Sequence, residues 1–195
     1  MQIAIGSIRH YFQSFQHSTQ ENSELTPAAV LILLFKKNDQ LHVILTKRTD
    51  RVKHHKGQIS FPGGTKDSAD MTIIDTALRE TEEEIGLTRD TVEILGMLND
   101  FCTPSGFCIT PIVGFLTAIP SFILNKIEVS EIFDVPLSFF LDSRNERMEQ
   151  HERSGKMTNV YFYKYSKYEI WGVTAAILRS FLIDLGTQKG QKKTL

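Results

Sequence analysis

Two apolar segments separated by a short polar stretch predict a β-hairpin near the start of the chain. The segments cover residues 28–35 and 41–47, and residues 37–40 supply the polar turn. Further β-rich runs predict strands around Ile59 and at residues 92–97, 109–115 and 159–165. Helical patterns lie between and after these runs. We therefore expect an α/β protein of the α+β kind, with parallel and antiparallel strands mixed in one sheet and with flanking helices.

The clearest helical pattern lies in the middle of the chain. Apolar side chains recur there at the spacing that makes one stripe on a helix: Ile74, Ala77, Leu78, Thr81 and Ile85. We expect a helix from Met71 to Ile85, with Asp70 as its N-cap and Gly86 as its C-terminal stop.

Both ends of the chain also predict helices. Residues 1–16 form an amphipathic pattern, and residues 172–185 are apolar enough for a helix with a buried face. The apolar positions of the first helix are Ile3, Ile8, Phe12 and Phe15. Residues 186–195 are expected to be a polar, frayed, flexible tail. A length of 195 residues fits one domain, 1–195, better than two.

Three carboxylates occupy the side of the central helix opposite its apolar stripe. Glu80, Glu83 and Glu84 stand at positions i, i+3 and i+4, which share one helix face. Like charges this close repel one another unless a cation neutralises them, and hard oxygen donors suit Mg²⁺ or Mn²⁺. From the acids alone, a solvated surface face remains the competing interpretation.

The segment before this helix strengthens the metal-site interpretation. Residues 57–64 form a short apolar strand that ends in Pro62, Gly63 and Gly64. Glycines let the backbone turn tightly and approach a ligand without Cβ atoms in the way. A strand, a glycine turn and an acidic helix together favour a site for phosphate and metal.

With these residues the chain resembles the Nudix hydrolases. The family signature is matched by Gly64, Arg79, Glu80, Glu83, Glu84, Gly86 and Leu87. Two positions depart from it: Asp70 stands in place of the upstream Glu, with eight residues instead of seven before Arg79, and Thr81 replaces an apolar residue. The resemblance implies the Nudix α/β/α sandwich.

The longer signature is similar to that of the coenzyme A pyrophosphatase subgroup. Segments 45–48 and 55–64 resemble its leader, and the likeness covers roughly residues 28–182. Further matching positions are 103–107, 110–111, 128–129, 133, 136–137 and 170–175. The resemblance implies cleavage of the diphosphate of coenzyme A or an acyl derivative, with Mg²⁺ or Mn²⁺ as cofactor.

The family motif also implies roles for the acids. Glu80 and Glu84 are expected to bind the metal directly, Glu83 to be a further ligand or to hold metal-bound water, and the carbonyl oxygen of Gly64 to complete the shell. Arg79 is expected to orient a carboxylate through a bidentate pair. As the base that deprotonates water we place Glu83 first. Glu128 is the further candidate, because it lies on a loop where related enzymes often place an additional carboxylate. Glu128 and Glu131 are equally well interpreted as surface acids.

Substrate recognition is assigned to other residues. Arg48, Lys53, His54, His55 and Lys56 form a basic patch before the glycine turn, suited to the diphosphate and to the 3′-phosphate of coenzyme A. Arg48, Lys53 and His55 are the candidates for substrate contact, with His54 less favoured, and the Gly63 and Gly64 backbone would lie against the phosphates.

Two aromatic residues and two cysteines leave alternatives open. Phe107 and Trp171 are either aromatic platforms for substrate or core residues, and for Trp171 we favour the core. Cys102 and Cys108 lack a partner at metal-binding spacing, so we interpret them as reduced packing residues.

Charge and hydropathy exclude some classes of partner. The chain has 22 basic and 23 acidic residues, which gives no electrostatic footprint for a nucleic acid. No apolar run reaches the ~18 residues of a membrane span, and the N-terminus does not resemble a signal peptide, so we expect a cytoplasmic protein without a membrane partner. We further expect a monomer or homodimer with a small nucleotide substrate.

Two rival functions remain open at this point. One is the same chemistry on another nucleoside diphosphate derivative, such as NADH, ADP-ribose or a nucleoside triphosphate. The other is a ligand sensor on the Nudix fold without catalysis, which a missing glutamate in the signature would favour; none is missing here.

Overall fold

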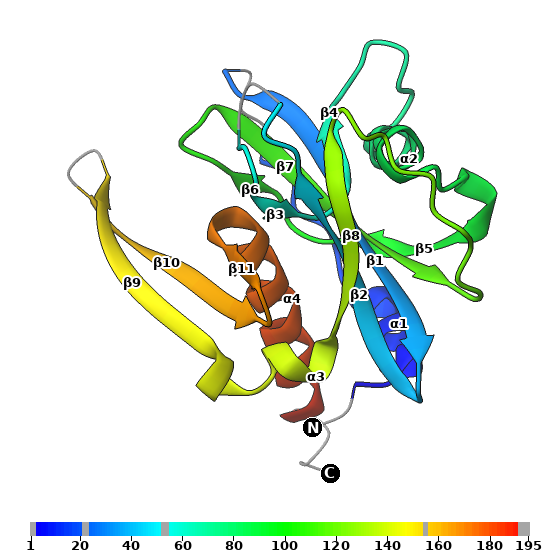
Figure 1. The fold of residues 1–195 in the computed structure, drawn as a ribbon. Coiled ribbons are helices and arrows are strands. Elements are labelled where there is room, and N and C mark those ends of the chain that lie inside the picture. Colours follow the sequence, from blue (N-terminus) through cyan, green and yellow to red (C-terminus); the bar gives the residue numbers. More distant parts are fainter. Residues whose placement is uncertain (1–2, 21–23, 52–54, 154–155, 191–195) are drawn as a thin grey trace.

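A computed structural model describes residues 3–20, 24–51, 55–153 and 156–190. Two β-sheets and four α-helices make up this part of the chain (Figure 1). The helices are α1 (Ile5–Ser14), α2 (Ile73–Ile85), α3 (Leu137–Phe140) and α4 (Gly172–Gly190), and short 3-10 turns lie at Arg89–Thr91 and Ser143–Asn145. No helix among the described residues is long and apolar enough to cross a membrane.

The larger sheet has eight strands and contains both parallel and antiparallel pairs. Its strands are β1 (Thr26–Lys37), β2 (Gln40–Arg48), β3 (Ile59–Ser60), β4 (Gly63–Thr65), β5 (Val92–Met97), β6 (Phe101–Cys102), β7 (Phe107–Leu116) and β8 (Val129–Pro136). β1 runs parallel to β7 along its length and antiparallel to β2 and β4. β1 is therefore the central strand, and it holds the glycine strand β4 in place.

The smaller sheet consists of β9 (Glu146–Arg153), β10 (Lys156–Tyr165) and β11 (Tyr168–Trp171), all antiparallel. It joins the larger sheet through a stacked pair, Phe133 on Tyr168, with ring centroids 3.7 Å apart. Glu131 reinforces this junction by accepting hydrogen bonds from Lys167 and Tyr168.

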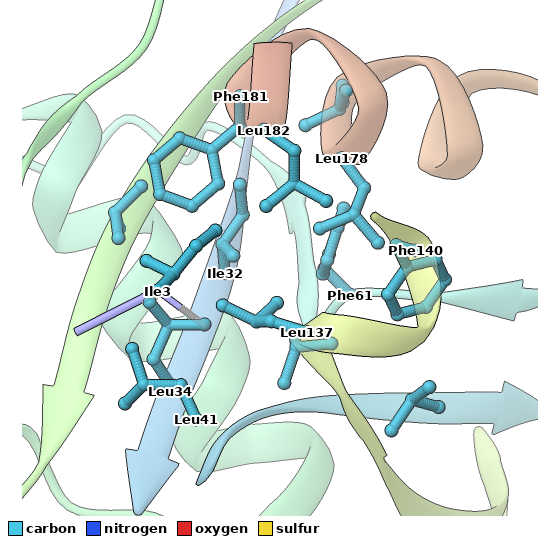
Figure 2. Close-up of a cluster of buried hydrophobic side chains, with 14 of the residues drawn as sticks. Ile3, Ile32, Leu34, Leu41, Phe61, Leu137, Phe140, Leu178, Phe181 and Leu182 are labelled. Atoms are coloured by element: carbon cyan, nitrogen blue, oxygen red, sulfur yellow. The ribbon is translucent and has the colours of Figure 1, made fainter. Parts of the chain in front are cut away.

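Two apolar clusters cover opposite faces of the larger sheet. Along β1 the side chains alternate: Leu31 and Leu33 belong to the cluster under α2, whereas Ile32 and Leu34 belong to the one that includes α4. Figure 2 shows the second cluster, where Phe181 and Leu182 of α4 meet Ile3, Ile32, Leu34, Leu137 and others. Helices on both faces of a mixed sheet confirm the predicted α/β/α layering.

Most predicted elements are confirmed, with shifted ends. The hairpin turn places Asn38 and Asp39 in the left-handed region, at φ 49° and 60°, which suits these residue types. β5 has the predicted bounds. α4 continues to Gly190, past the expected end at Leu185, and residues 191–195 of the expected tail lie outside the described residues.

The N-cap prediction for the central helix is wrong. α2 begins at Ile73 with Thr72 as N-cap, because the Thr72 hydroxyl accepts from the Asp75 N–H while the Asp75 carboxylate accepts from the Thr72 N–H. Asp70 lies before this capping box and has another role, described below. The predicted apolar stripe is confirmed, with Ala77, Thr81 and Ile85 fully buried.

Candidate active site

The acids of α2 face the glycine strand β4. The Glu84 side chain is buried, and its Oε2 lies 3.4 Å from the Gly63 backbone nitrogen, which donates to it. The half-buried Glu80 lies over Gly64, because a Cβ atom on Gly64 would stand 2.3 Å from the Glu80 Cδ. Helical spacing i, i+4 therefore brings both carboxylates onto the same stretch of backbone. Glu83 is exposed beside them, with 56% of its side chain accessible.

Glycine at position 64 makes room for the Glu80 carboxylate, which gives a direct test. Gly64→Ala is expected to fold, because the clashing group is the end of a side chain that can move. It should lower turnover by about tenfold or more, because displaced catalytic groups lose rate steeply. Activity and circular dichroism would be measured on the same preparation.

Gly6→Ala in α1 is the matched control, because its Cβ would meet nothing within 4 Å. Unchanged activity in Gly64→Ala would show that the position of Glu80 does not matter for turnover.

Arg79 joins the acids in one network. Its Nε and Nη2 donate to the two oxygens of Asp70 at 2.9 and 3.0 Å, a bidentate pair. Its Nη1 donates to Glu80 at 2.9 Å and to Glu83 at 3.3 Å, and its Nη2 also donates to the Thr65 carbonyl. Arg79 thus contacts carboxylates, as the sequence predicted for it, and links Asp70 to Glu80.

Asp70 is the residue that fixes Arg79. It is buried, accepts a further hydrogen bond from the Thr76 hydroxyl at 2.9 Å, and its pKa is held well below the usual range by hydrogen bonding to Arg79. The shorter Asp in place of Glu thus reaches Arg79 despite the extra residue in the signature.

Removing this carboxylate should destabilise the fold. Asp70→Ala is expected to cost about 3 kcal/mol in the free energy of unfolding, because it leaves Arg79 without its buried partner. A carboxyl whose pKa is lowered by folding stabilises the folded state at pH values above its ordinary pKa, and this stabilisation is lost as the pH falls. Acidification below about pH 4 should therefore reduce the free energy of unfolding less in Asp70→Ala than in wild type. Urea titrations at pH 7 and pH 3 measure both effects.

The exposed Asp90→Ala provides the control, with an expected change within about 0.5 kcal/mol. An equally small change in Asp70→Ala would mean that Arg79 does not depend on the pair.

Burial and mutual repulsion disfavour ionisation of both inner acids. Burial raises the pKa of Glu84 to about 8, while Arg48 and the Gly63 N–H act in the opposite direction, and Glu80 and Glu128 add repulsion. The pKa of Glu80 is also raised, first by burial and then by Glu83 and Glu128, against the effect of Arg79. A bound cation would relieve this cost, because it favours the charged carboxylates.

Metal binding was predicted for Glu80, Glu83, Glu84 and the Gly64 carbonyl. Among the described residues, no three His, Cys, Asp or Glu side chains converge closely enough to hold a metal ion as they stand. Glu80 and Glu84 nevertheless fit one by chemistry, because they are two hard oxygen donors, partly desolvated, on one face of a rigid helix.

Arg48 reaches the same place from the end of β2. Its Nη1 donates to Glu84 Oε1 at 3.5 Å, and its buried Nε has no hydrogen-bond partner among the described residues. A buried guanidinium nitrogen without a hydrogen-bond partner is unfavourable in isolation, and it suits an anionic ligand. The structure therefore brings this predicted substrate residue to the acids.

The charge of Glu128 acts on the acids of α2, whereas Glu131 pairs elsewhere. Glu128 raises the pKa values of both Glu80 and Glu84, and Asn125 Nδ2 donates to it at 3.4 Å. Glu131 instead pairs with Lys47, Lys167 and Tyr168 at the junction of the sheets. The two acids that the sequence left equal are thus placed differently.

Asn125 is a site residue that the sequence analysis missed. Its backbone N–H donates to the Glu84 carbonyl, its side chain accepts from the Ile127 N–H, and its carbonyl accepts from the Glu128 N–H. These bonds attach the turn that carries Glu128 to the end of α2. The Asn at the head of a turn, two residues before Ile127, is a recognisable Asx-turn signal.

Two further basic residues of the patch are exposed. His55 is exposed, in a left-handed conformation, with its Nδ1 2.8 Å from the Gln58 oxygen, and Lys56 is also exposed. Lys53 and His54 lie outside the described residues. Of the basic patch that the structure describes, Arg48 alone contacts an acid of α2 through an ion pair.

The aromatic candidates belong to neither core cluster. Phe107 is partly buried at the start of β7, two strands from β4 across β1. The core placement of Trp171 is wrong: its side chain is partly exposed and stacks parallel on Phe162, with ring centroids 6.0 Å apart, on the side of β10 and β11 opposite buried Tyr163 and Ile170.

Similar proteins identify the family. The NUDIX domain model matches residues 25–133, which is more than half of the chain. A Photorhabdus laumondii protein named uncharacterized Nudix hydrolase NudL is 41% identical over 151 residues, covering 77% of this chain and 80% of that protein. Its namesake from Salmonella newport is 33% identical over 186 residues, covering 93% and 96%.

Solved structures show the same fold at low sequence identity. A NUDIX hydrolase from Alicyclobacillus acidocaldarius superposes with a TM-score of 0.52 at 16% identity, over 84% of this chain and 93% of that one. An Ap4A hydrolase from C. elegans gives a TM-score of 0.51 at 14% identity, over 84% and 97%. The family match, the long alignments with relatives and the shared fold agree, and the chain belongs to the Nudix hydrolase family.

Proposed function

We propose that this chain is a Mg²⁺- or Mn²⁺-dependent pyrophosphohydrolase that cleaves the diphosphate linkage of coenzyme A or acyl-coenzyme A. The products are 3′,5′-ADP and 4′-phosphopantetheine or its acyl derivative. Members of the family act on small nucleotide compounds with diphosphate bonds and generally use divalent metal ions. The choice of coenzyme A, the metal, a cytoplasmic location and a monomeric or homodimeric state are predictions from the sequence.

One observation carries the proposal. Glu80 and Glu84 share the face of α2 that lies over Gly63 and Gly64, so two desolvated carboxylates adjoin backbone without side chains. Cations held by these carboxylates would attract a diphosphate, and Arg48 beside Glu84 offers its guanidinium to phosphate oxygens.

The proposed roles follow from this placement. A divalent cation, when bound, neutralises phosphate charge and lowers the pKa of water. Glu80, Glu84 and the Gly64 carbonyl would hold it, with Glu83 as a further acid, and Arg79 keeps Glu80 in position through the pair at 2.9 Å. For the acceptor of the water proton, Glu83 and Glu128 are the two candidates. The sequence places Glu83 first, although Arg79 holds it, and Glu128 is the second candidate because its charge raises the pKa values of Glu80 and Glu84.

Coenzyme A is preferred over other nucleotides for reasons of sequence. The longer signature and segments 45–48, 55–64 and 170–175 resemble those of the coenzyme A subgroup. Exposed His55 and Lys56 add basic groups outside the inner site, suited to a phosphate remote from the scissile bond.

Product analysis tests the proposal. The purified protein would be incubated with Mg²⁺ or Mn²⁺ and equal concentrations of coenzyme A, acetyl-coenzyme A, NADH, ADP-ribose and a nucleoside triphosphate, and the products identified by mass spectrometry. We expect preferential release of 3′,5′-ADP with phosphopantetheine. Glu84→Gln, prepared identically, excludes a contaminating hydrolase.

Two other outcomes would assign a rival function. Faster cleavage of NADH, ADP-ribose or the triphosphate would keep the Nudix chemistry and refute the coenzyme A specificity. No cleavage of any compound, with binding still detectable by calorimetry, would favour the ligand sensor.

A further inference from the structure

Cys102 and Cys108 face each other across the β6–β7 hairpin. The two residues are register partners, and their Sγ atoms are 3.6 Å apart. The neighbouring pair, Thr103 and Phe107, is joined by a hydrogen bond from the Thr103 N–H to the Phe107 carbonyl. The cysteines therefore occupy a non-hydrogen-bonded site, because the two kinds of pair alternate along an antiparallel ladder.

This kind of site suits a disulfide. The Cα atoms of non-hydrogen-bonded partners lie about 4.5 Å apart, and disulfides accept Cα separations between roughly 4.4 and 6.8 Å. Both thiols are free, Cys102 is exposed and Cys108 is partly buried. Neither belongs to an apolar core cluster, and the interpretation of Cys102 as a packing residue is wrong because its side chain is exposed.

The reduced thiols make only weak hydrogen bonds that oxidation would remove. Cys102 Sγ donates to Gln20 Oε1 at 2.9 Å, and Cys108 Sγ lies 3.7 Å from the Gln20 carbonyl. Thiols are weak donors, so little opposes their loss. Burial, followed by the hydrogen bond to Cys102 and the charge of Asp100, raises the pKa of Cys108 to about 12, so Cys108 stays protonated and reacts slowly. Cys102 is the exposed thiol, so reagents in solution react with Cys102 first.

We propose that Cys102 and Cys108 are a site of reversible oxidation that forms an intramolecular disulfide by exchange with a low-molecular-weight disulfide. Cys102 gives up its proton, and its thiolate attacks one sulfur of the small disulfide; the other sulfur leaves with a proton as one small thiol. Cys108 then gives up its proton and attacks the Cys102 sulfur, which releases the second small thiol. The two protein thiols are oxidised, and the small disulfide is reduced to two thiols.

Equilibration in glutathione buffers tests the site independently of any enzymatic activity. The protein would be equilibrated at a fixed concentration of reduced glutathione and a series of concentrations of oxidised glutathione. Free thiols would then be blocked with an alkylating agent, and the mass of the protein measured by mass spectrometry. Wild type is expected to lose the mass of two hydrogens, take up no alkyl group, and regain both thiols when reduced glutathione is restored.

Cys108→Ser provides the matched control, because it keeps the exposed thiol without its partner. We expect this variant to carry one glutathione instead. Wild type should reach half-oxidation at an oxidised-glutathione concentration at least about tenfold lower, since a partner at 3.6 Å has a high effective concentration. Circular dichroism of Cys108→Ser and Cys102→Ser checks that both fold.

Three results would overturn the proposal. They are glutathione bound to wild-type Cys102 without an internal disulfide, two free thiols under conditions that modify Cys108→Ser, and a disulfide-linked dimer in place of the internal bridge.

Discussion

Glu84→Gln is expected to abolish most turnover while making the metal-free protein more stable at alkaline pH. The substitution removes a proposed ligand charge without changing shape, and losing several kcal/mol of charge stabilisation corresponds to a fall in turnover of about 10²-fold or more. The stability gain comes from burial, which raises the pKa of Glu84 to about 8. Both effects are measured on one preparation, by steady-state kinetics and by unfolding in a chelator.

The sign of the pH effect follows from proton binding. Between the ordinary glutamate pKa near 4.3 and about 8, the folded state keeps the Glu84 proton that the unfolded state releases, so wild-type stability falls as pH rises through this window. The fall should be roughly 2–5 kcal/mol and absent in Glu84→Gln. Added Mg²⁺ or Mn²⁺ should raise the melting temperature of wild type more than that of the variant.

Glu82→Gln is the control, because Glu82 is an exposed neighbour on the same helix. Near-normal turnover in Glu84→Gln would refute the ligand assignment. A stability curve that still falls between pH 5 and 8 in the variant would place the responsible proton on another residue.

Arg48→Lys is expected to lower kcat/KM for coenzyme A and for 3′-dephospho-coenzyme A by the same factor, about 10- to 100-fold. Lysine keeps the charge but loses the planar fork that phosphate oxygens match. Because Arg48 lies against Glu84, we expect it to serve the diphosphate, which both substrates carry. Comparison of the two substrates in steady-state kinetics measures this.

Lys56→Ala distinguishes the role of the exposed basic residues, His55 and Lys56, from that of Arg48. Lys56 is exposed, so this variant should fold normally. Because we expect His55 and Lys56 to bind the 3′-phosphate, kcat/KM should fall for coenzyme A and stay unchanged for 3′-dephospho-coenzyme A. A loss confined to coenzyme A in Arg48→Lys would instead assign the 3′-phosphate to Arg48. Equal kcat/KM for the two substrates in wild type would leave the patch without a role in recognition.

The sequence predicted the acids of α2 well because helical spacing is local. Glu80 and Glu84 share one face whatever the rest of the chain does. The expectation that this face lies opposite the apolar stripe is wrong for Glu84, because Glu84 is buried together with Ala77 and Ile85. The role of Asp70 could not be predicted from local sequence, because an Asp that caps a helix and an Asp that pairs with an Arg look alike in sequence. Thr72 and Asp75 form the cap, and Asp70 pairs with Arg79 instead.

Placement of Glu128, Glu131 and Trp171 could not be predicted in the same way. Each depends on contacts between distant segments, such as Asn125 on the end of α2 or Tyr168 on Phe133. β9 was missed for a related reason: its sequence, ERMEQHER, is almost entirely polar, and it pairs as a strand because β10 supplies a partner.

The parallel pairing of β1 with β7 has a consequence for the order of folding. Thr26 pairs with Phe107 and Phe35 with Leu116, so β4 and α2 lie inside a long loop that this pairing closes. Closing such a loop costs chain entropy before the contacts form, which makes the step slow. A nascent chain that ends after α2 would therefore contain every signature glutamate but would lack the β7 strand that completes the sheet beneath them.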